Sequence, residues 1–243
     1  MMGRDAGILL DPKAQPVIAH RGASGAYPEN TLLAFDRALQ DGADALELDV
    51  RISADGVPVV IHDPTVSRTT DGTGKVRAMT AAALERLDAG HGERIPRLEA
   101  VVERYRTTPL LIEIKEAAAS LASLAVLRRH GAERQVLVGS FEWRALIPFR
   151  RAGIPTTPAR IEVALLLLLS RIGMSWPARV AAYAVPERKR WVRIVNERFL
   201  RLARRAGRPV HVWTVNEPDD ARRLRAMGIC GIITNFPGRM RDL

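Results

Sequence analysis

The stretch PVIAHRGASGAYPENTLLAFDRALQDGADALELDV, residues 16–50, holds a short apolar run, a loop, an amphipathic segment and a second apolar run. PVIAH (16–20) and ALELDV (45–50) have the length and composition of buried strands. Between them four apolar residues recur at helical spacing, followed by a glycine that is typical of a helix end: Leu32, Phe35, Ala38, Leu39 and Gly42. This order predicts two parallel strands joined by a helical crossover.

The same alternation of short strand-like runs and longer helical ones continues along the chain. Six further runs have strand character: 109–115, 135–141, 154–161, 181–185, 209–215 and 231–236. Eight such units in 243 residues favour a single-domain α/β (β/α)8 barrel, a TIM barrel covering 1–243, over an open doubly wound sheet.

One interval is too short for a helical crossover. Only ADG separates LELDVRIS from VPVVIHD, so these two runs are expected to form an antiparallel hairpin. A turn centred on Asp55 and Gly56 would place Asp49 opposite His62 and bring Glu47 onto the same face. We expect the hairpin and the following residues, about 52–96, to form a small excursion over the barrel rim.

Polar residues gather where the predicted strands end, which is the rim that carries the active site in barrel enzymes. Arginine or lysine, carboxylate, histidine and tryptophan side chains all occur there: His20, Arg21, Glu47, Asp49, His62, Glu113, Lys115, Trp213 and Asn216.

Three of these residues predict a metal site. Glu47, Asp49 and Glu113 lie inside otherwise apolar strands, where carboxylates are costly to bury and repel one another. A hard divalent cation with oxygen ligands, Mg²⁺ or Ca²⁺, would relieve this repulsion. The alternative is that the carboxylates pair with Arg21 or Lys115. The sequence has no cysteine and histidine cluster typical of zinc.

The remaining rim residues suit chemistry at phosphorus. His20 and His62 are candidate acid and base groups, because imidazole titrates near neutral pH. Arg21 and Lys115 are candidate phosphate-binding cations. A divalent ion, two histidines and two cations together indicate phosphodiester cleavage. We expect His91 and His211 to be structural, and His130 to act as a favourable charge at a helix end.

Charge and cysteine content limit the function classes. The net charge of +10 comes mostly from arginine and is compatible with an anionic membrane, an anionic substrate, nucleic acid or a bias in arginine usage. Scattered arginines and an aromatic content of 5% argue against nucleic acid as a partner. A single cysteine, Cys230, excludes an intramolecular disulfide, and the apolar patch at the N-terminus is too short and acidic for a signal peptide. We therefore expect a cytoplasmic protein.

Residues 158–208 are the least regular part of the sequence. Residues 161–185 are too apolar for a solvent-facing helix, which favours core packing, and residues 188–208 predict a helix with a solvated arginine-rich face. The alternative is a peripheral surface that contacts a membrane or a partner.

With these residues in place, the chain resembles the glycerophosphodiester phosphodiesterase family over most of its length. The ordered motifs that carry the resemblance are IAHRGASGAYPENTLLAF, GADALELDVRISADGVPVVIHDPTVSRTTDGTG, GERIPRLEAVV, LIEIK, VGSF and VHVWTVNEPDDARRLRAMGICGIITNFP. The resemblance implies a barrel of the phospholipase C-like phosphodiesterase type, one divalent cation, and hydrolysis of glycerophosphodiesters to sn-glycerol 3-phosphate and an alcohol in lipid and glycerol metabolism. Attack by water and attack by a substrate hydroxyl through a cyclic intermediate both remain open.

Position by position, the resemblance implies the same site. The catalytic pair is His20 and His62, the metal ligands are Glu47, Asp49 and Glu113, and the substrate-binding residues are Arg21, Lys115 and Trp213, with Trp213 as an aromatic wall. In the YPENT motif, Asn30 is expected to cap the following helix.

Two departures from the family pattern bear on substrate and electrostatics. Asn235 stands where an aspartate is usual, which removes a carboxylate near the last strand, and residues 158–186 match poorly. Three hypotheses follow: an enzyme acting on water-soluble glycerophosphodiesters, a lysophospholipase D-like enzyme at a membrane surface, and a non-catalytic phosphate-ligand binding protein.

Overall fold

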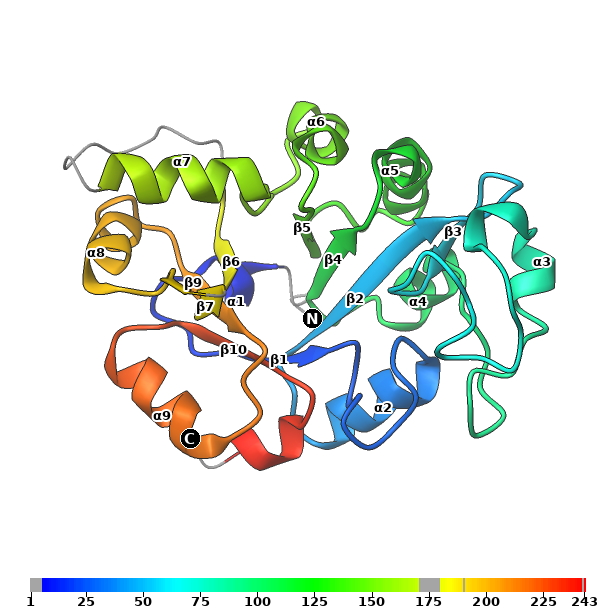
Figure 1. Cartoon of the computed structure of the whole chain (residues 1–243), viewed down its shortest axis with the longest axis horizontal. Helices are drawn as coiled ribbons and strands as arrows, with labels where there is room; N and C mark the ends of the chain where they lie inside the picture. The colour runs from blue at the N-terminus through cyan, green and yellow to red at the C-terminus, as the bar shows by residue number, and fades with distance from the viewer. Residues whose placement is uncertain (1–5, 171–179, 190, 242) are drawn as a thin grey trace.

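The computed structural model describes residues 6–170, 180–189, 191–241 and 243. Seven parallel strands form a curved sheet in the order β5-β4-β2-β1-β10-β9-β6 (Figure 1). Their bounds are β1 (Val17–His20), β2 (Ala45–Ile52), β4 (Leu110–Ile114), β5 (Val136–Gly139), β6 (Tyr183–Pro186), β9 (Val210–Trp213) and β10 (Gly231–Thr234). The predicted (β/α)8 barrel is confirmed.

The segment 154–157, between β5 and β6, closes the barrel without forming a regular strand. It makes one parallel bridge, Val138 with Thr156, and the backbone N–H of Ala181 donates to the Thr156 carbonyl at 2.8 Å. The predicted strand 154–161 is therefore wrong beyond this bridge. Pro155 and Pro158 lack the N–H that a ladder needs, and a helix already begins at Arg160.

Helices surround the barrel on the outside (Figure 1). They are α2 (Leu32–Gln40), α4 (Leu98–Arg104), α5 (Ser120–Arg129), α6 (Trp143–Arg151), α7 (Arg160–Ser170), α8 (Glu197–Arg205) and α9 (Pro218–Ala226), with the short helices η2 (Ala117–Ala119) and η3 (Pro237–Met240). The N-cap of α2 is Thr31, whose hydroxyl accepts from the Ala34 N–H, so the predicted cap at Asn30 is wrong. Asn30 has φ +60° and turns its side chain into the barrel instead.

An apolar layer fills the lower part of the barrel interior. It consists of side chains from the strands together with the N-terminal helix α1 (Gly7–Leu10): Leu9, Ile18, Ala45, Leu111, Leu137, Ala182 and Ile233. His211 belongs to this level, fully buried, with Nε2 donating to the Leu9 carbonyl at 2.8 Å. Because strand side chains alternate, residues two positions further along each strand point inward above this layer.

The hairpin after β2 is confirmed, but its predicted register is off by one residue. β3 (Pro58–Val60) pairs antiparallel with β2, Val50 opposite Val60, and the Ile61 N–H donates to the Asp49 carbonyl at 2.9 Å. Asp49 therefore faces Ile61 rather than His62, since the turn centres on Asp55 alone. His62 reaches the site because the chain leaves the strand geometry after Val60.

The excursion that follows carries its own small apolar cluster. It contains η1 (Val76–Ala78) and α3 (Ala81–Leu84), and its buried residues are Val59, Ile61, Val66, Val76, Ala81, Leu84 and Ile95. This packing holds the loop that carries His62 against the barrel rim.

The region that was hardest to interpret from sequence is partly buried and partly exposed. Leu166 of α7 is buried, whereas Ile161 and Leu168 are 57% and 59% exposed, so core packing explains only one side of α7. The two-residue strands β7 (Arg188–Lys189) and β8 (Val192–Arg193) form a short hairpin, so the helix predicted over residues 188–208 is wrong in its first part and α8 begins only at Glu197. The arginines of α8 face solvent, as predicted. Residues 171–179 of the apolar segment lie outside the described residues. Among the described residues, none of the helices has the length and apolar character to cross a bilayer.

Candidate active site

The carboxyl ends of the barrel strands enclose a cavity of about 140 Å³. Seven of the eight predicted site residues line it: His20, Arg21, Glu47, His62, Glu113, Lys115 and Trp213. The eighth, Asp49, lies beneath the surface with 1% of its area exposed. Side chains that point into the barrel recur every second residue along a strand. The inward positions that follow the apolar layer are therefore His20 on β1, Glu47 and Asp49 on β2, and Glu113 on β4.

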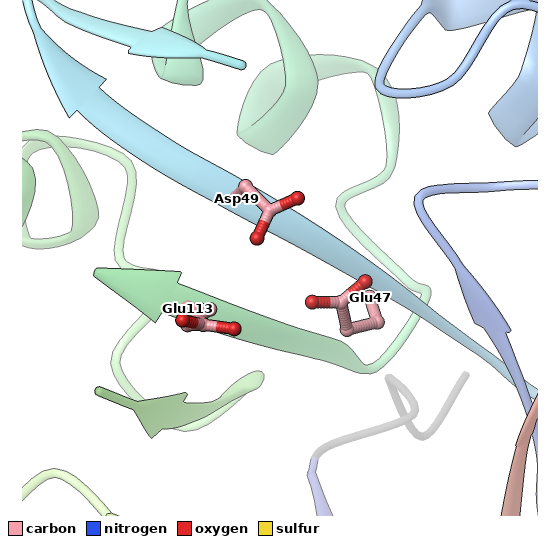
Figure 2. Close-up of side chains that lie close together, drawn as sticks. All are labelled: Glu47, Asp49 and Glu113. Carbon is pink, nitrogen blue, oxygen red and sulfur yellow. The ribbon is translucent and has the colours of Figure 1, made fainter. Parts of the chain in front are cut away.

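The three predicted metal ligands form one cluster. Figure 2 shows Glu47 and Asp49 from β2 and Glu113 from β4, and one carboxylate oxygen of each lies within 4.8 Å of the others. Burial raises the pKa of Glu47 well above its usual value, and repulsion from Asp49 and Glu113 adds to this. Burial and the Asp49 charge also raise the pKa of Glu113. A bound cation would reverse both effects.

Asp49 is the most constrained of the three carboxylates. Its Oδ2 lies 3.0 Å from Arg21 Nε and accepts a hydrogen bond from Asn30 Nδ2, also at 3.0 Å. Lys115 Nζ lies 3.3 Å from Oδ1, in ion-pair range but without hydrogen-bond geometry, so no described residue donates a hydrogen bond to this buried oxygen. Burial would raise the pKa of Asp49, but the charges of Lys115 and Arg21 outweigh it and hold that pKa below its usual value.

The carboxylates thus both cluster and pair with the neighbouring cations. Lys115 Nζ lies 2.7 Å from Glu113 Oε1, and the Arg21 backbone N–H donates to Glu47 Oε2 at 2.9 Å. The Asp49 oxygen that accepts no hydrogen bond from the described residues, and the raised pKa of Glu47 and of Glu113, fit a hard divalent cation with oxygen ligands, Mg²⁺ or Ca²⁺.

His20 is oriented by Asn235, which follows strand β10. Its Nδ1 lies 2.7 Å from Asn235 Oδ1, which leaves Nε2 directed into the cavity, 4.0 Å from Glu47 Oε2. Burial, followed by the Arg21 charge, lowers the pKa of His20, so the imidazole is neutral at neutral pH. Asn216 in turn accepts from the Asn235 N–H at 3.0 Å.

His62 is oriented by a carboxylate that the sequence analysis did not select. Its Nδ1 lies 2.6 Å from Asp63 Oδ1, and Arg68 Nε donates to the other Asp63 oxygen at 2.6 Å. The hydrogen bond from Arg68 holds the pKa of Asp63 far below its usual range. The adjacent His-Asp pair was a visible signal for Asp63, whereas Arg68 had none.

Glu29 links this arrangement to the other side of the cavity. Arg68 donates to both Glu29 oxygens, at 2.7 and 2.8 Å, and Arg21 Nη1 donates to Glu29 Oε1 at 3.0 Å. The acidic residue of the YPENT motif therefore connects Arg21 to the loop that carries His62.

Aromatic rings form another part of the cavity wall. Trp213 meets Phe141 edge to face with ring centroids 6.0 Å apart, and Lys115 Nζ lies 5.6 Å from the Phe141 centroid. Trp213 was predicted, but Phe141 was missed, although it is the last residue of the VGSF motif, which was the available signal.

The fold and this cavity define a (β/α)8-barrel enzyme with its site at the carboxyl rim, built around a carboxylate cluster and two oriented imidazoles. Residues 20–239 match the model of the glycerophosphoryl diester phosphodiesterase family. The chain belongs to this family, which confirms the resemblance noted in its motifs.

Curated relatives and solved structures agree with this assignment. The chain is 33% identical over 241 residues to the glycerophosphodiester phosphodiesterase of Caldanaerobacter subterraneus subsp. tengcongensis, covering 93% of this chain and 96% of that protein. It is 31% identical over 259 residues to the Bacillus subtilis glycerophosphodiester phosphodiesterase, covering 95% and 87%. An Oleispira antarctica phosphodiesterase solved with its product sn-glycerol 3-phosphate superposes with a TM-score of 0.79 at 29% identity, covering 94% of this chain and 96% of that one.

Proposed function

We propose that this protein hydrolyses water-soluble glycerophosphodiesters to sn-glycerol 3-phosphate and an alcohol, in a reaction that depends on one divalent cation. The observation that carries the proposal is the meeting of two imidazoles, two cations and a carboxylate cluster in one cavity of a chain from this family. The related Oleispira antarctica phosphodiesterase, which was solved with sn-glycerol 3-phosphate, supports the product.

Glu47, Asp49 and Glu113 would hold the cation, Mg²⁺ or Ca²⁺. When bound, a divalent ion supplies charge neutralisation at the phosphoryl oxygens and lowers the pKa of an oxygen nucleophile. Asn30 fixes the Asp49 carboxylate by two contacts, since its Nδ2 donates to Oδ2 and its Oδ1 accepts from the Asp49 N–H at 3.2 Å. A ligand held in this way needs little reorganisation to bind.

His20 and His62 would carry out the proton transfers. Asn235 and Asp63 each hold an Nδ1 atom, so both imidazoles turn Nε2 toward the substrate. One ring can then take a proton from the attacking oxygen while the other delivers one to the leaving alkoxide.

Arg21, Lys115 and Trp213 would bind the substrate. The two cations present positive charge to the phosphate from opposite sides of Asp49. Trp213 and Phe141 provide an apolar wall against which an organic substituent of the phosphate can pack.

The test is release of sn-glycerol 3-phosphate from glycerophosphocholine and glycerophosphoethanolamine by purified protein, before and after chelation and with Mg²⁺ or Ca²⁺ restored. We expect chelation to abolish release and one cation to restore it. Glu47→Gln and His20→Ala should each lower turnover by at least about 10²-fold.

Matched controls are Glu103→Gln and His91→Ala, which change exposed side chains of the same types away from the cavity. Both should retain full activity. If no phosphodiester is cleaved while glycerol 3-phosphate still binds, the protein is a non-catalytic phosphate-ligand binding protein. Activity that persists in Glu47→Gln would show that the metal ligands are misassigned.

The proposed role is in glycerophospholipid breakdown in the cytoplasm. Cytoplasmic location rests on the sequence alone, in particular on the single cysteine, and stays a prediction.

A further inference from the structure

A second, larger cavity opens beside the active site. It has a volume of about 480 Å³ and shares four wall residues with the active-site cavity: Phe141, Pro158, Ala184 and Trp213. The two cavities therefore join at the aromatic wall that faces the reacting phosphate in the proposed function. We call the larger one the side groove.

The walls of the side groove come from segments far apart in sequence. Val163 and Ala164 come from α7, Val185 and Pro186 from β6, and Val192 from β8 of the β7–β8 hairpin. In the view of Figure 1, α7 lies above β6 and β7 lies below β6. Apart from three cationic residues, all the residues that line the groove are apolar or aromatic.

The charged residues of the side groove are all cationic. Arg160, Arg188 and Lys189 line it, and the described part of the lining contains no carboxylate. The Arg160 guanidinium lies 5.1 Å from the Phe141 ring centroid, at the junction with the active site. Among the described residues, neither Arg188 nor Lys189 makes an ion pair within 4 Å, so their charge is available to an anionic ligand.

The two cavities differ in volume, and this difference indicates which part of a ligand each can hold. Sites that enclose a small organic molecule commonly measure about 300–1,000 Å³. The active-site cavity, at about 140 Å³, is large enough for the reacting phosphate and little more, whereas the side groove is within that range. An apolar groove that continues from a phosphate site fits an anionic amphiphile.

We propose that the side groove binds a linear alkyl chain attached to the phosphodiester substrate, so that the enzyme prefers amphiphilic phosphodiesters to glycerophosphocholine. This inference rests on the proposed function of the active site. The chain can be part of the alcohol half or an acyl group on the glycerol half. Both present the same alkyl chemistry to the groove.

The experiment compares turnover along two soluble substrate series. One series has ethyl, butyl and hexyl alcohols esterified to sn-glycerol 3-phosphate, and the other has short acyl groups on the glycerol of glycerophosphocholine. We expect kcat/KM to rise with chain length in one series, up to about fourfold per methylene, the equivalent of about 0.8 kcal/mol for a buried methylene. The series that responds identifies the half of the substrate that carries the chain.

Ala164→Trp fills the side groove without touching the catalytic residues. It should flatten the dependence of kcat/KM on chain length, because the alkyl chain can no longer be buried in the groove. Turnover of glycerophosphocholine, which has no such chain, should stay within about twofold of wild type. The matched control is Ala125→Trp, an exposed alanine of the same kind in the middle of α5, which should keep the full dependence.

Binding of n-alkyl phosphates, measured by titration calorimetry with Mg²⁺ or Ca²⁺ present, gives a readout that does not need turnover. Affinity that rises from ethyl to hexyl phosphate and is flattened by Ala164→Trp supports the groove even if no diester is cleaved, in which case only the proposed function fails. Cleavage of glycerophosphocholine with no chain-length dependence in turnover or binding overturns the inference and leaves the proposed function intact. If Ala164→Trp instead changes the oligomeric state in size-exclusion chromatography without changing chain dependence, the groove is a self-association face and the inference is wrong.

Discussion

Lowering the pH should destabilise this protein through His211, a residue remote from the active-site cavity. The ring is fully buried, with Nε2 donating to the Leu9 carbonyl, and Nδ1 has no hydrogen-bond partner among the described residues. Protonation would add an N–H at Nδ1 that nothing accepts. Burial therefore lowers the pKa of His211 from 6.5 to about 4, and the bond to Leu9 only partly opposes this.

The direction and size of the effect follow from this shift. The unfolded chain takes up the proton below about pH 6.5 and the folded protein only near pH 4, so His211 contributes full stability above pH 6.5 and loses it as the pH falls. The loss is about 1.4 kcal/mol at pH 5.5 and about 2.5 kcal/mol at pH 4.5, relative to pH 7.5.

Urea unfolding of wild type and His211→Gln at pH 7.5 and pH 4.5 measures the loss. Glutamine can donate to the Leu9 carbonyl through Nε2 but does not titrate, so wild type should lose about 2.5 kcal/mol more than the variant on acidification. His91→Gln, at an exposed histidine, keeps His211 and should therefore lose as much free energy of unfolding on acidification as wild type. If wild type and His211→Gln lose the same free energy of unfolding, the assignment of a buried neutral imidazole is wrong.

Three further predictions concern the active site. Asp63→Asn should lower kcat by about 10²-fold with little change in KM or Tm, because the His62 ring loses the carboxylate whose Oδ1 lies 2.6 Å from its Nδ1 while the fold stays the same. Steady-state kinetics measures this, and a rise in KM alone would contradict it. Asn30→Ala should cost about 2 kcal/mol of unfolding free energy and weaken cation affinity at least tenfold, since Asp49 loses two hydrogen bonds; urea unfolding and metal titration measure both. Adding Mg²⁺ or Ca²⁺ at 100 times its Kd should stabilise wild type by about 2.7 kcal/mol, and unchanged Tm at saturation would argue against a cation site.

The errors in the sequence-based fold have local causes. The run 154–161 has strand-like composition, but two prolines interrupt its hydrogen bonding and leave a single bridge at Thr156. The hairpin register was off by one because its turn centres on Asp55 alone, so Asp49 pairs with Ile61. Strand pairing in the first case and turn geometry in the second depend on the backbone conformation, which residue composition describes poorly.

The site was predictable where its residues follow strand periodicity. Inward-facing positions at strand ends located Glu47, Asp49 and Glu113 from the sequence, and the structure brings them together. Of the missed residues that act through others, Asp63 stands next to His62 and had a local signal, whereas nothing local marks Arg68. The Arg68 guanidinium takes its place at the site through hydrogen bonds to Glu29, which lies 39 positions earlier in the chain.

The sequence by itself determined the alternation of strands and helices, the inward direction of the side chains at the strand ends, and the family. Each of these depends on short-range periodicity and on residue types in a fixed order. Only the tertiary structure decided that Asn235 orients His20 across 215 positions, and that α7, β6 and the β7–β8 hairpin enclose the side groove. These contacts join segments whose separation is set by barrel closure and loop packing, which no local pattern of residues encodes.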